Sequence, residues 1–105
     1  MSTRKKMKDA MEFLEELTGG PLTFGEALAA VRDRENISQT ELARKAGVRR
    51  STICDLEKGR RLPSPELAAR YAKILRHSEK QFIRLALQDQ LRKAGIKYQV
   101  NLEAA

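Results

Sequence analysis

The sequence is poor in several residue types that mark common classes of protein. Among its 105 residues there is one cysteine, Cys54, and no tryptophan. A single cysteine cannot form an internal disulfide, so a disulfide-rich secreted domain is excluded and a reducing compartment is favoured. No apolar run approaches the roughly 20 residues that span a bilayer, and the first residues, MSTRKKMKDAMEF, lack the apolar core of a signal peptide. We therefore expect a cytoplasmic protein that does not bind membranes.

Motifs that mark enzymes and cofactor-binding proteins are missing as well. The chain has no glycine-rich phosphate loop, no paired-cysteine metal spacing and no nucleophile elbow. His77 adjoins an expected helix start, and the sequence places no carboxylate near it. Cys54 is interpreted as a small packing residue, with a redox switch as the alternative. We expect no enzymatic activity, no catalytic residue, no bound metal and no cofactor.

Positive charge is abundant in this chain. Lysine and arginine number 21 against 14 aspartates and glutamates, which gives a formal net charge of +7 and a pI near 9.9. Such an excess favours an acidic partner, either nucleic acid or an anionic surface. The length is sufficient for a single domain with one modest core and short extensions.

The stretch from Ser38 to Arg61 is expected to form two helices joined by a tight turn. Ser38 and Glu41 have the spacing of a capping box at the start of the first helix. Gly47 supplies the positive φ that ends it, and Gly59 ends the second helix. Helices joined this closely cross steeply, so the polar start of the second one should project from the body. From position 39 to 61 there are three acidic residues and seven basic ones: Arg44, Lys45, Arg49, Arg50, Lys58, Arg60 and Arg61. The stretch is therefore interpreted as a docking surface for an anion.

This stretch resembles the helix-turn-helix of lambda-repressor and Cro-type proteins, the XRE-like regulators. The resemblance runs from about Thr23 to Leu75 and rests on Glu41-Leu42-Ala43, Gly47-Val48, Ser51-Thr52-Ile53, Leu56-Glu57-Lys58-Gly59-Arg60 and Pro63. It implies an all-α, five-helix DNA-binding domain that contacts double-stranded DNA through Gln39, Arg49, Arg50, Ser51, Thr52, Asp55, Lys58 and Arg60. Among these, Gln39, Lys58 and Arg60 are expected to hold phosphates, and Arg50 is the first candidate to read a base. The resemblance also implies an ion pair between Arg32 and Glu57. Arg49 stands where the family usually has a capping side-chain oxygen, so the free amides of that helix could bind a phosphate instead.

Capping signals predict the remaining helices of the domain. One starts at Thr23, which has Glu26 three residues on, and ends near Asn36. Another runs from Glu66 to Leu75 after a Ser64 cap and Pro65. A last helix runs from Ser78 to about Ala94. The expected core residues are Phe24, Leu28, Val31, Leu42, Ala43, Ala46, Ile53, Leu56, Leu67, Tyr71, Ile74, Leu75, Phe82, Leu85 and Ala86.

Segments that flank this domain supply candidate interaction surfaces. Residues 1–20 are assigned to an amphipathic helix, Met7 to Leu17, and a Thr18-Gly19-Gly20-Pro21 linker; that helix could cover the domain's own core or contact another chain. The DNA-binding domain is placed at 21–77 and the C-terminal helix at 78–95. On this helix a second apolar arc, which includes Ile83, Leu87 and Leu91, is a candidate dimer surface. In the tail, 96–105, Ile96 to Val100 alternates as a strand does. In an all-helical chain such a strand must be frayed, pair with its copy in a dimer, or add to a sheet of another protein.

We conclude from the sequence that the chain is a DNA-binding repressor, encoded by a bacterium or a phage, that binds a palindromic operator as a homodimer. Two other interpretations remain open. Short chains of this type also resemble antitoxins of bacterial toxin-antitoxin operons (HigA-like proteins), which bind their own promoter and neutralise a toxin protein. A nucleoid or DNA-packaging role would need no base selection.

Overall fold

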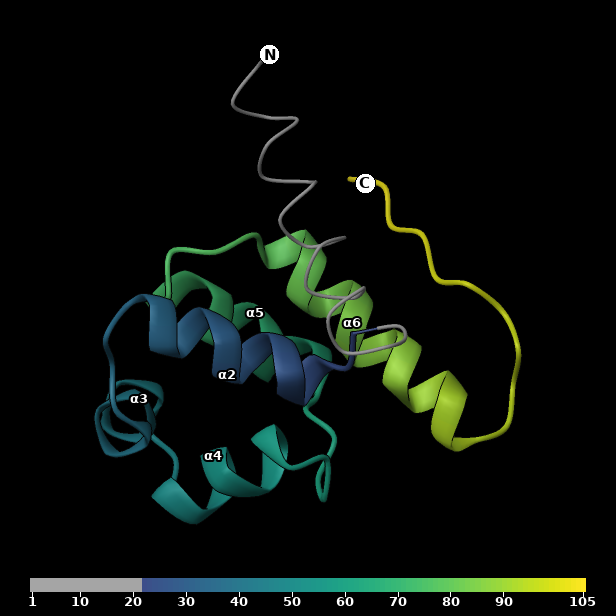
Figure 1. The fold of residues 1–105 in the computed structure, drawn as a ribbon. Helices are drawn as coiled ribbons and strands as arrows, with labels where there is room; N and C mark the ends of the chain where they lie inside the picture. Colours follow the sequence, from purple (N-terminus) through teal and green to yellow (C-terminus); the bar gives the residue numbers. More distant parts are fainter. Residues whose placement is uncertain (1–21) are drawn as a thin grey trace.

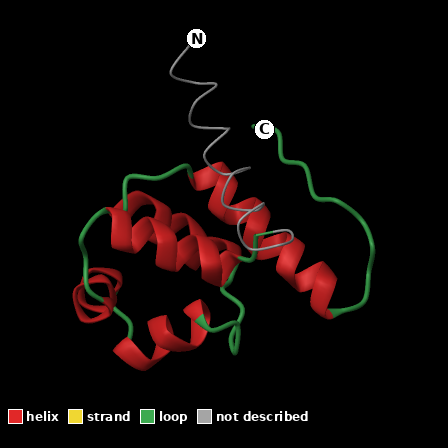
Figure 2. Ribbon diagram, viewed as in Figure 1, coloured by secondary structure: helices red, strands yellow, loops and turns green. Residues whose placement is uncertain are grey.

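The computed structural model describes residues 22–105, and these residues form five α-helices (Figure 1). The helices are α2 (Phe24–Arg34), α3 (Gln39–Ala46), α4 (Arg50–Glu57), α5 (Pro65–Ile74) and α6 (Glu79–Lys93). Within the described range there are helices and loops but no strand (Figure 2). The predicted all-α fold is confirmed for this part of the chain. The amphipathic helix predicted for Met7 to Leu17 lies outside the described residues.

The helices start where the capping signals place them. Thr23 accepts a hydrogen bond from the Glu26 amide at 3.1 Å, and the Glu26 carboxylate accepts one from the Thr23 amide, so the capping box is complete. Three serines cap α3, α5 and α6 through one hydrogen bond each, accepted from the amide three residues on: Ser38, Ser64 and Ser78. The reciprocal bond of the capping box predicted at Ser38 and Glu41 is not formed. Each such cap typically stabilises a helix by about 1 kcal/mol.

Left-handed residues end the helices and turn the chain. Gly47, between α3 and α4, has φ of 73°, and Asn36, after α2, has φ of 56°. Both positions agree with the sequence analysis. Arg76 also has a positive φ, 53°, which no sequence signal indicated, because arginine rarely adopts this conformation.

The core is formed by one side of every described helix. Its largest buried side chains are aromatic: the Phe24 ring lies 6.4 Å from that of Tyr71 and 5.3 Å from that of Phe82, centroid to centroid. The predicted stripe of α5 is incomplete, because Leu67 and Ile74 pack against the core while only half-buried, and Ala68 and Ala72 are fully buried. A ranking by hydrophobicity does not predict that the small alanines are the more buried residues of α5, whose main neighbour is α6.

Gly25 allows α2 and α4 to cross at very short range. A Cβ atom at this position would lie 2.2 Å from the Leu56 carbonyl oxygen and 2.8 Å from that of Glu57. Only a glycine fits between the α2 backbone and the last carbonyls of α4. The contact fixes the distance of α4 from the body, and the sequence analysis did not single out this glycine.

Asp89 ties α6 to the start of α2. Its Oδ2 accepts a hydrogen bond from the Phe24 amide at 2.8 Å, and its Oδ1 accepts one from Arg92 at 3.0 Å. The carboxylate is almost fully buried and satisfies a free amide in the first turn of α2. On the same face of α6, the predicted residues Phe82, Leu85 and Ala86 are buried.

The strand predicted for Ile96 to Val100 is not formed in this chain. Residues 96–105 have no regular secondary structure and run back along α6 (Figure 1). A strand needs the backbone of a neighbouring strand as its partner, and here the Gln88 side chain takes that place. Its Nε2 donates to the Tyr98 carbonyl and its Oε1 accepts from the Val100 amide, each at 2.8 Å.

Candidate nucleic-acid interface

The turn between α3 and α4 sets the direction of α4. Val48 donates its amide hydrogen to the Ala43 carbonyl at 3.0 Å and packs against the core. Ile53 and Leu56 anchor α4 through its buried side. The opposite side and the first turn of α4 are therefore open to solvent, and Arg49, Arg50 and Ser51 are exposed there.

The start of α4 differs from the starts of the other four described helices. Arg49 has the extended conformation of an N-cap residue, yet its side chain accepts no hydrogen bond, and the first turn holds no acidic residue. Free amides and the helix dipole make a helix start electropositive. The two guanidinium groups of Arg49 and Arg50 add full positive charges. This end of α4 is suited to bind an anion such as a phosphate.

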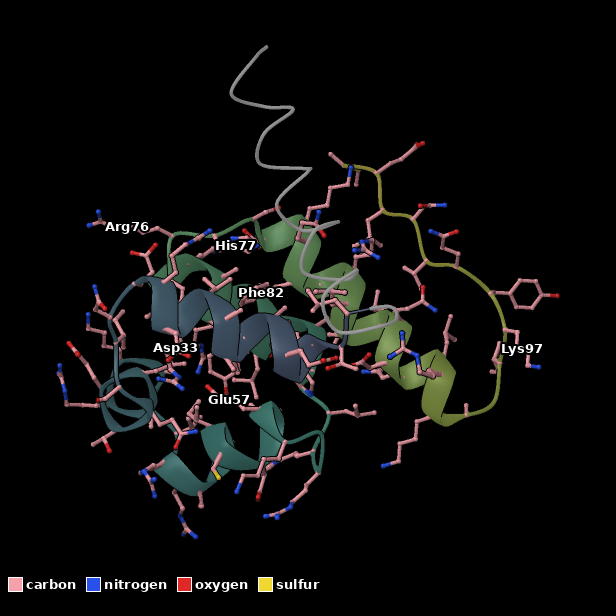
Figure 3. All side chains as sticks on the ribbon, in the orientation of Figure 1. Asp33, Glu57, Arg76, His77, Phe82 and Lys97 are labelled. Carbon is pink, nitrogen blue, oxygen red and sulfur yellow. The ribbon has the colours of Figure 1, made fainter. Side chains whose placement is uncertain are left out.

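Basic side chains surround this helix start. All seven basic residues between positions 39 and 61 are exposed, and nitrogen-tipped side chains extend outward from α4 in Figure 3. The three acidic residues of the stretch each lie near a basic group: Glu41 is 3.6 Å from Lys45, Asp55 is 3.8 Å from Arg60, and Glu57 pairs with Arg32. Only the last of these pairs is buried.

Glu57, the last residue of α4, forms a bidentate ion pair with Arg32 of α2. Arg32 Nε donates to Glu57 Oε2 at 2.6 Å and Arg32 Nη2 donates to Oε1 at 3.0 Å, with side chains that are 13% and 8% exposed. This hydrogen bonding raises the pKa of Arg32 above its usual value, although burial acts in the opposite direction. Arg32 Nη1 also donates to the Ile37 carbonyl at 2.8 Å. The pair therefore connects α2, α4 and the loop before α3 (Glu57 is labelled in Figure 3).

Gln39 joins this network from the first turn of α3. Its Nε2 donates to Glu57 Oε1 at 2.9 Å, so the side chain that was expected on a phosphate is aimed at the ion pair. An amide nitrogen has two hydrogens, and the second can still donate to a phosphate. The network thus holds a candidate contact residue in a defined orientation.

The other predicted contact residues have distinct surroundings. Thr52 and Asp55 are half-buried, whereas Lys58 and Arg60 are exposed in the turn after α4. Asp55 was expected to accept from a base or to orient Arg50, and its ion-pair neighbour among the described residues is Arg60. Arg70 of α5, which the sequence analysis did not select, donates to the Ala46 carbonyl at 3.2 Å and so caps the end of α3. No spacing signal in the sequence could have indicated that contact.

Residues 22–105 contain neither a cluster of metal ligands nor a helix suited to cross a membrane. No group of three or more histidine, cysteine, aspartate or glutamate side chains in this range could hold a metal ion. None of the described helices has the length and apolar character needed to cross a bilayer.

Comparison with known proteins places this chain in a family. The sequence model of a family described as helix-turn-helix matches residues 28–80, about half of the chain. Two proteins of Archaeoglobus fulgidus, each described as an uncharacterized HTH-type transcriptional regulator, are 49% identical to it over 43 residues. Those residues are 41% of this chain, and they span 61% of the length of each relative. From its five described helices and the matching sequence model, the chain belongs to the helix-turn-helix family, in its lambda-repressor-like, XRE-type form.

Proposed function

We propose that this protein is a transcriptional regulator that binds double-stranded DNA, and specifically a repressor that binds a palindromic operator as a homodimer. The observation that carries the proposal is the exposed, uncapped and basic start of α4, held in position from behind by Glu57 and Arg32. Family membership and the names of the two relatives support the broader statement, DNA-binding regulation of transcription. The proposal assigns the chain no catalytic role.

Two kinds of contact would contribute to binding: contacts to phosphates and contacts to bases. Lys58 and Arg60, together with Gln39 and the free amides of α4, would hold phosphates, which supply affinity but carry no sequence information. Arg49 and Arg50 begin the helix that would enter the major groove, where a guanidinium can donate two hydrogen bonds to O6 and N7 of guanine. Arg50 is the first candidate as reader. Ser51 and Thr52 could contact a phosphate, a base edge or a thymine methyl group, and Asp55 could accept from a cytosine amino group.

A two-fold dimer would present two copies of α4 to one side of the duplex. In proteins of this kind the two recognition helices lie about 34 Å apart, one turn of DNA, so that each reads the same half-site sequence. The candidate dimer surface is the half-buried arc of α6 formed by Ile83, Leu87 and Leu91. The operator should accordingly be a palindrome.

Selection of bound DNA from a randomised duplex library tests this function directly. The full chain should enrich a palindromic sequence, and its affinity should fall steeply with salt, because several phosphate contacts release counterions. Binding without enrichment of any sequence would instead favour a nucleoid or packaging role. Failure to bind DNA in low salt would contradict both.

An antitoxin role is the second candidate, and the tail favours it. Gln88 bonds the tail at the Tyr98 carbonyl and the Val100 amide, two groups that lie on the same edge when a segment is extended. The Ile96 and Tyr98 side chains are 44% and 76% exposed. Such a segment can add to a sheet of another protein, here a toxin. If a small, toxin-sized reading frame adjoins the gene, co-expression of this chain should relieve the toxicity of the product of that frame. The Tyr98→Asp variant of this chain should leave the toxicity unrelieved. Unrelieved growth arrest would remove this candidate.

A further inference from the structure

A groove lies between α6 and the returning tail. Its volume is about 600 Å³, and Leu22, Leu85 and Ile96 give it an apolar lining. In Figure 1 α6 and the tail lie on the right of the molecule and α3 lies on the left, so the groove is separate from the candidate DNA interface. Ile96 is 44% exposed, so part of its apolar surface is open to an occupant of the groove.

The charged residues of this groove are all basic. Arg84, Arg92 and Lys97 line it, and no acidic side chain is among the described lining residues. Arg92 is bonded to Asp89 beneath it at 3.0 Å, and Arg84 donates to the neutral Gln81. The cationic groups of Arg84 and Lys97 therefore remain available to an acidic occupant. An apolar lining with a basic rim fits an amphipathic segment with acidic residues on its polar side.

The sequence holds such a segment directly before the groove. Leu22, the first described residue, lines the groove, so residues 1–21 continue from that point. Residues 7–17 contain one lysine and four acidic residues (Asp9, Glu12, Glu15 and Glu16), a net charge of 1 − 4 = −3, in a chain whose net charge is +7. Their apolar residues, Met7, Ala10, Met11, Phe13, Leu14 and Leu17, fall on one side of a helix.

We propose that residues 7–17 form an amphipathic helix that packs its apolar side into the groove of its own chain, with its acidic residues facing Arg84 and Lys97. An 11-residue helix is about 16 Å long, and the linker Thr18–Pro21 reaches at most about 14 Å. A short linker of this kind holds the segment at a millimolar effective concentration. The chain's own segment therefore outcompetes a second copy at micromolar protein concentration. This contact requires no DNA and is independent of the proposed function.

Paramagnetic broadening of nuclear magnetic resonance signals tests the contact in the full chain. A nitroxide is attached at Gln99→Cys, beside the groove, in a Cys54→Ser background that removes the one native thiol. With spin label and ¹⁵N on the same molecules, diluted into untagged protein without ¹⁵N, the amide signals of residues 7–17 should be broadened. The same label at Lys45→Cys on α3 is the control and should leave these signals sharp.

A mixed sample and two variants make the result decisive. If the signals broaden only when ¹⁵N-labelled untagged chains are mixed with tagged chains without ¹⁵N, a second copy fills the groove and the proposal is wrong. Sharp signals in both samples also overturn it. Phe13→Gln should abolish the broadening, whereas Lys8→Gln, the matched change on the polar side of the same segment, should preserve it. Undiminished broadening in Phe13→Gln would contradict an apolar contact.

Discussion

At the scale of single residues, we expect Glu57 to affect both the stability of the domain and its binding to DNA. Its carboxylate is 8% exposed and accepts hydrogen bonds from Arg32 and Gln39, which belong to two other helices. Removing one partner of a buried ion pair leaves the other charge unpaired, and this typically costs 3–5 kcal/mol. The same network orients the Gln39 side chain. Loss of the Glu57 carboxylate should therefore affect both stability and DNA binding.

We therefore expect Glu57→Ala to lower the free energy of unfolding by about 3 kcal/mol. Glu57→Gln keeps the shape but removes the charge and should be destabilised nearly as much, because Arg32 stays buried. The matched control is Glu35→Ala, since the Arg34–Glu35 pair is exposed and its atoms are 3.8 Å apart; it should change stability by less than about 1 kcal/mol. Denaturant unfolding measures all three. Equal stability of Glu57→Ala and wild type would remove the pair as a stabilising element.

Arg50 and Lys58 provide a second comparison between residues. Arg50→Ala should relax the preference at one base pair of each half-site, a loss of about 1 to 3 kcal/mol of discrimination. Lys58→Ala and Arg60→Ala should weaken binding to all sequences alike and reduce the salt slope by about 1 each. Binding selections and salt titrations with each variant separate these roles. Equal loss for every sequence in Arg50→Ala would make Arg50 a phosphate contact and move base reading to Arg49, Ser51 or Asp55.

At the scale of helices, the crossing of α2 and α4 depends on Gly25. Helix propensity alone predicts that Gly25→Ala stabilises α2 by about 1 kcal/mol. The structure predicts the opposite sign, because the added methyl group would lie 2.2 Å from the Leu56 carbonyl oxygen. We expect a loss of about 1 to 3 kcal/mol in unfolding free energy, the usual cost of overpacking, together with weaker DNA binding. Increased stability of Gly25→Ala would show that α4 stands further from α2.

The outer arc of α6 is the element expected to join two chains. Leu87 and Leu91 are half-buried there, and the opposite face of the helix is packed into the core. Replacing both leucines by glutamate places like charges across a two-fold interface, so light scattering should report monomers and cooperative DNA binding should be lost. Lys93→Glu, which adds an acidic side chain at an exposed position of the same helix, is the control. A double variant that stays dimeric would place the interface elsewhere on the protein.

At the scale of the whole molecule, one half-buried imidazole, that of His77, contributes to the pH dependence of stability. Burial, and then the charge of Arg34, lower the pKa of His77 below its ordinary value of 6.5. Its Nε2 has no hydrogen-bond partner among the described residues, and its ring lies 5.0 Å from that of Phe82 (Figure 3). As the pH is lowered through 6.5, the unfolded chain therefore binds more protons than the folded one. The free energy of unfolding decreases as the pH is lowered, until the pKa of the folded state is passed.

We expect the melting temperature of wild type to fall between pH 7.5 and pH 5.5 by more than that of His77→Gln, which lacks the titrating group. Burial raises the pKa of Asp89, so its effect has the opposite sign and stabilises the folded chain as the pH falls. Asp89 is present in both proteins, so the difference between their curves reports His77. Parallel curves for the two proteins would show that His77 titrates alike in both states.

Much of this molecule follows from local features of its sequence. Serine and threonine caps, Gly47 and Asn36 specify helix ends through hydrogen bonds and φ angles within a few residues. The amphipathic pattern then selects most of the core. These signals depend on neighbours along the chain, which is why the all-α class and the helix starts could be predicted.

Only the tertiary structure decided the contacts between distant residues. Asp89 caps α2 from 65 residues away, Gly25 sets the spacing of α4, and Gln88 takes the place of a partner strand beside the tail. The order of residues along the chain does not say which carbonyl will approach a given glycine or which amide a carboxylate will reach. These contacts depend on how the helices pack, because packing alone brings such atoms within hydrogen-bonding or van der Waals distance.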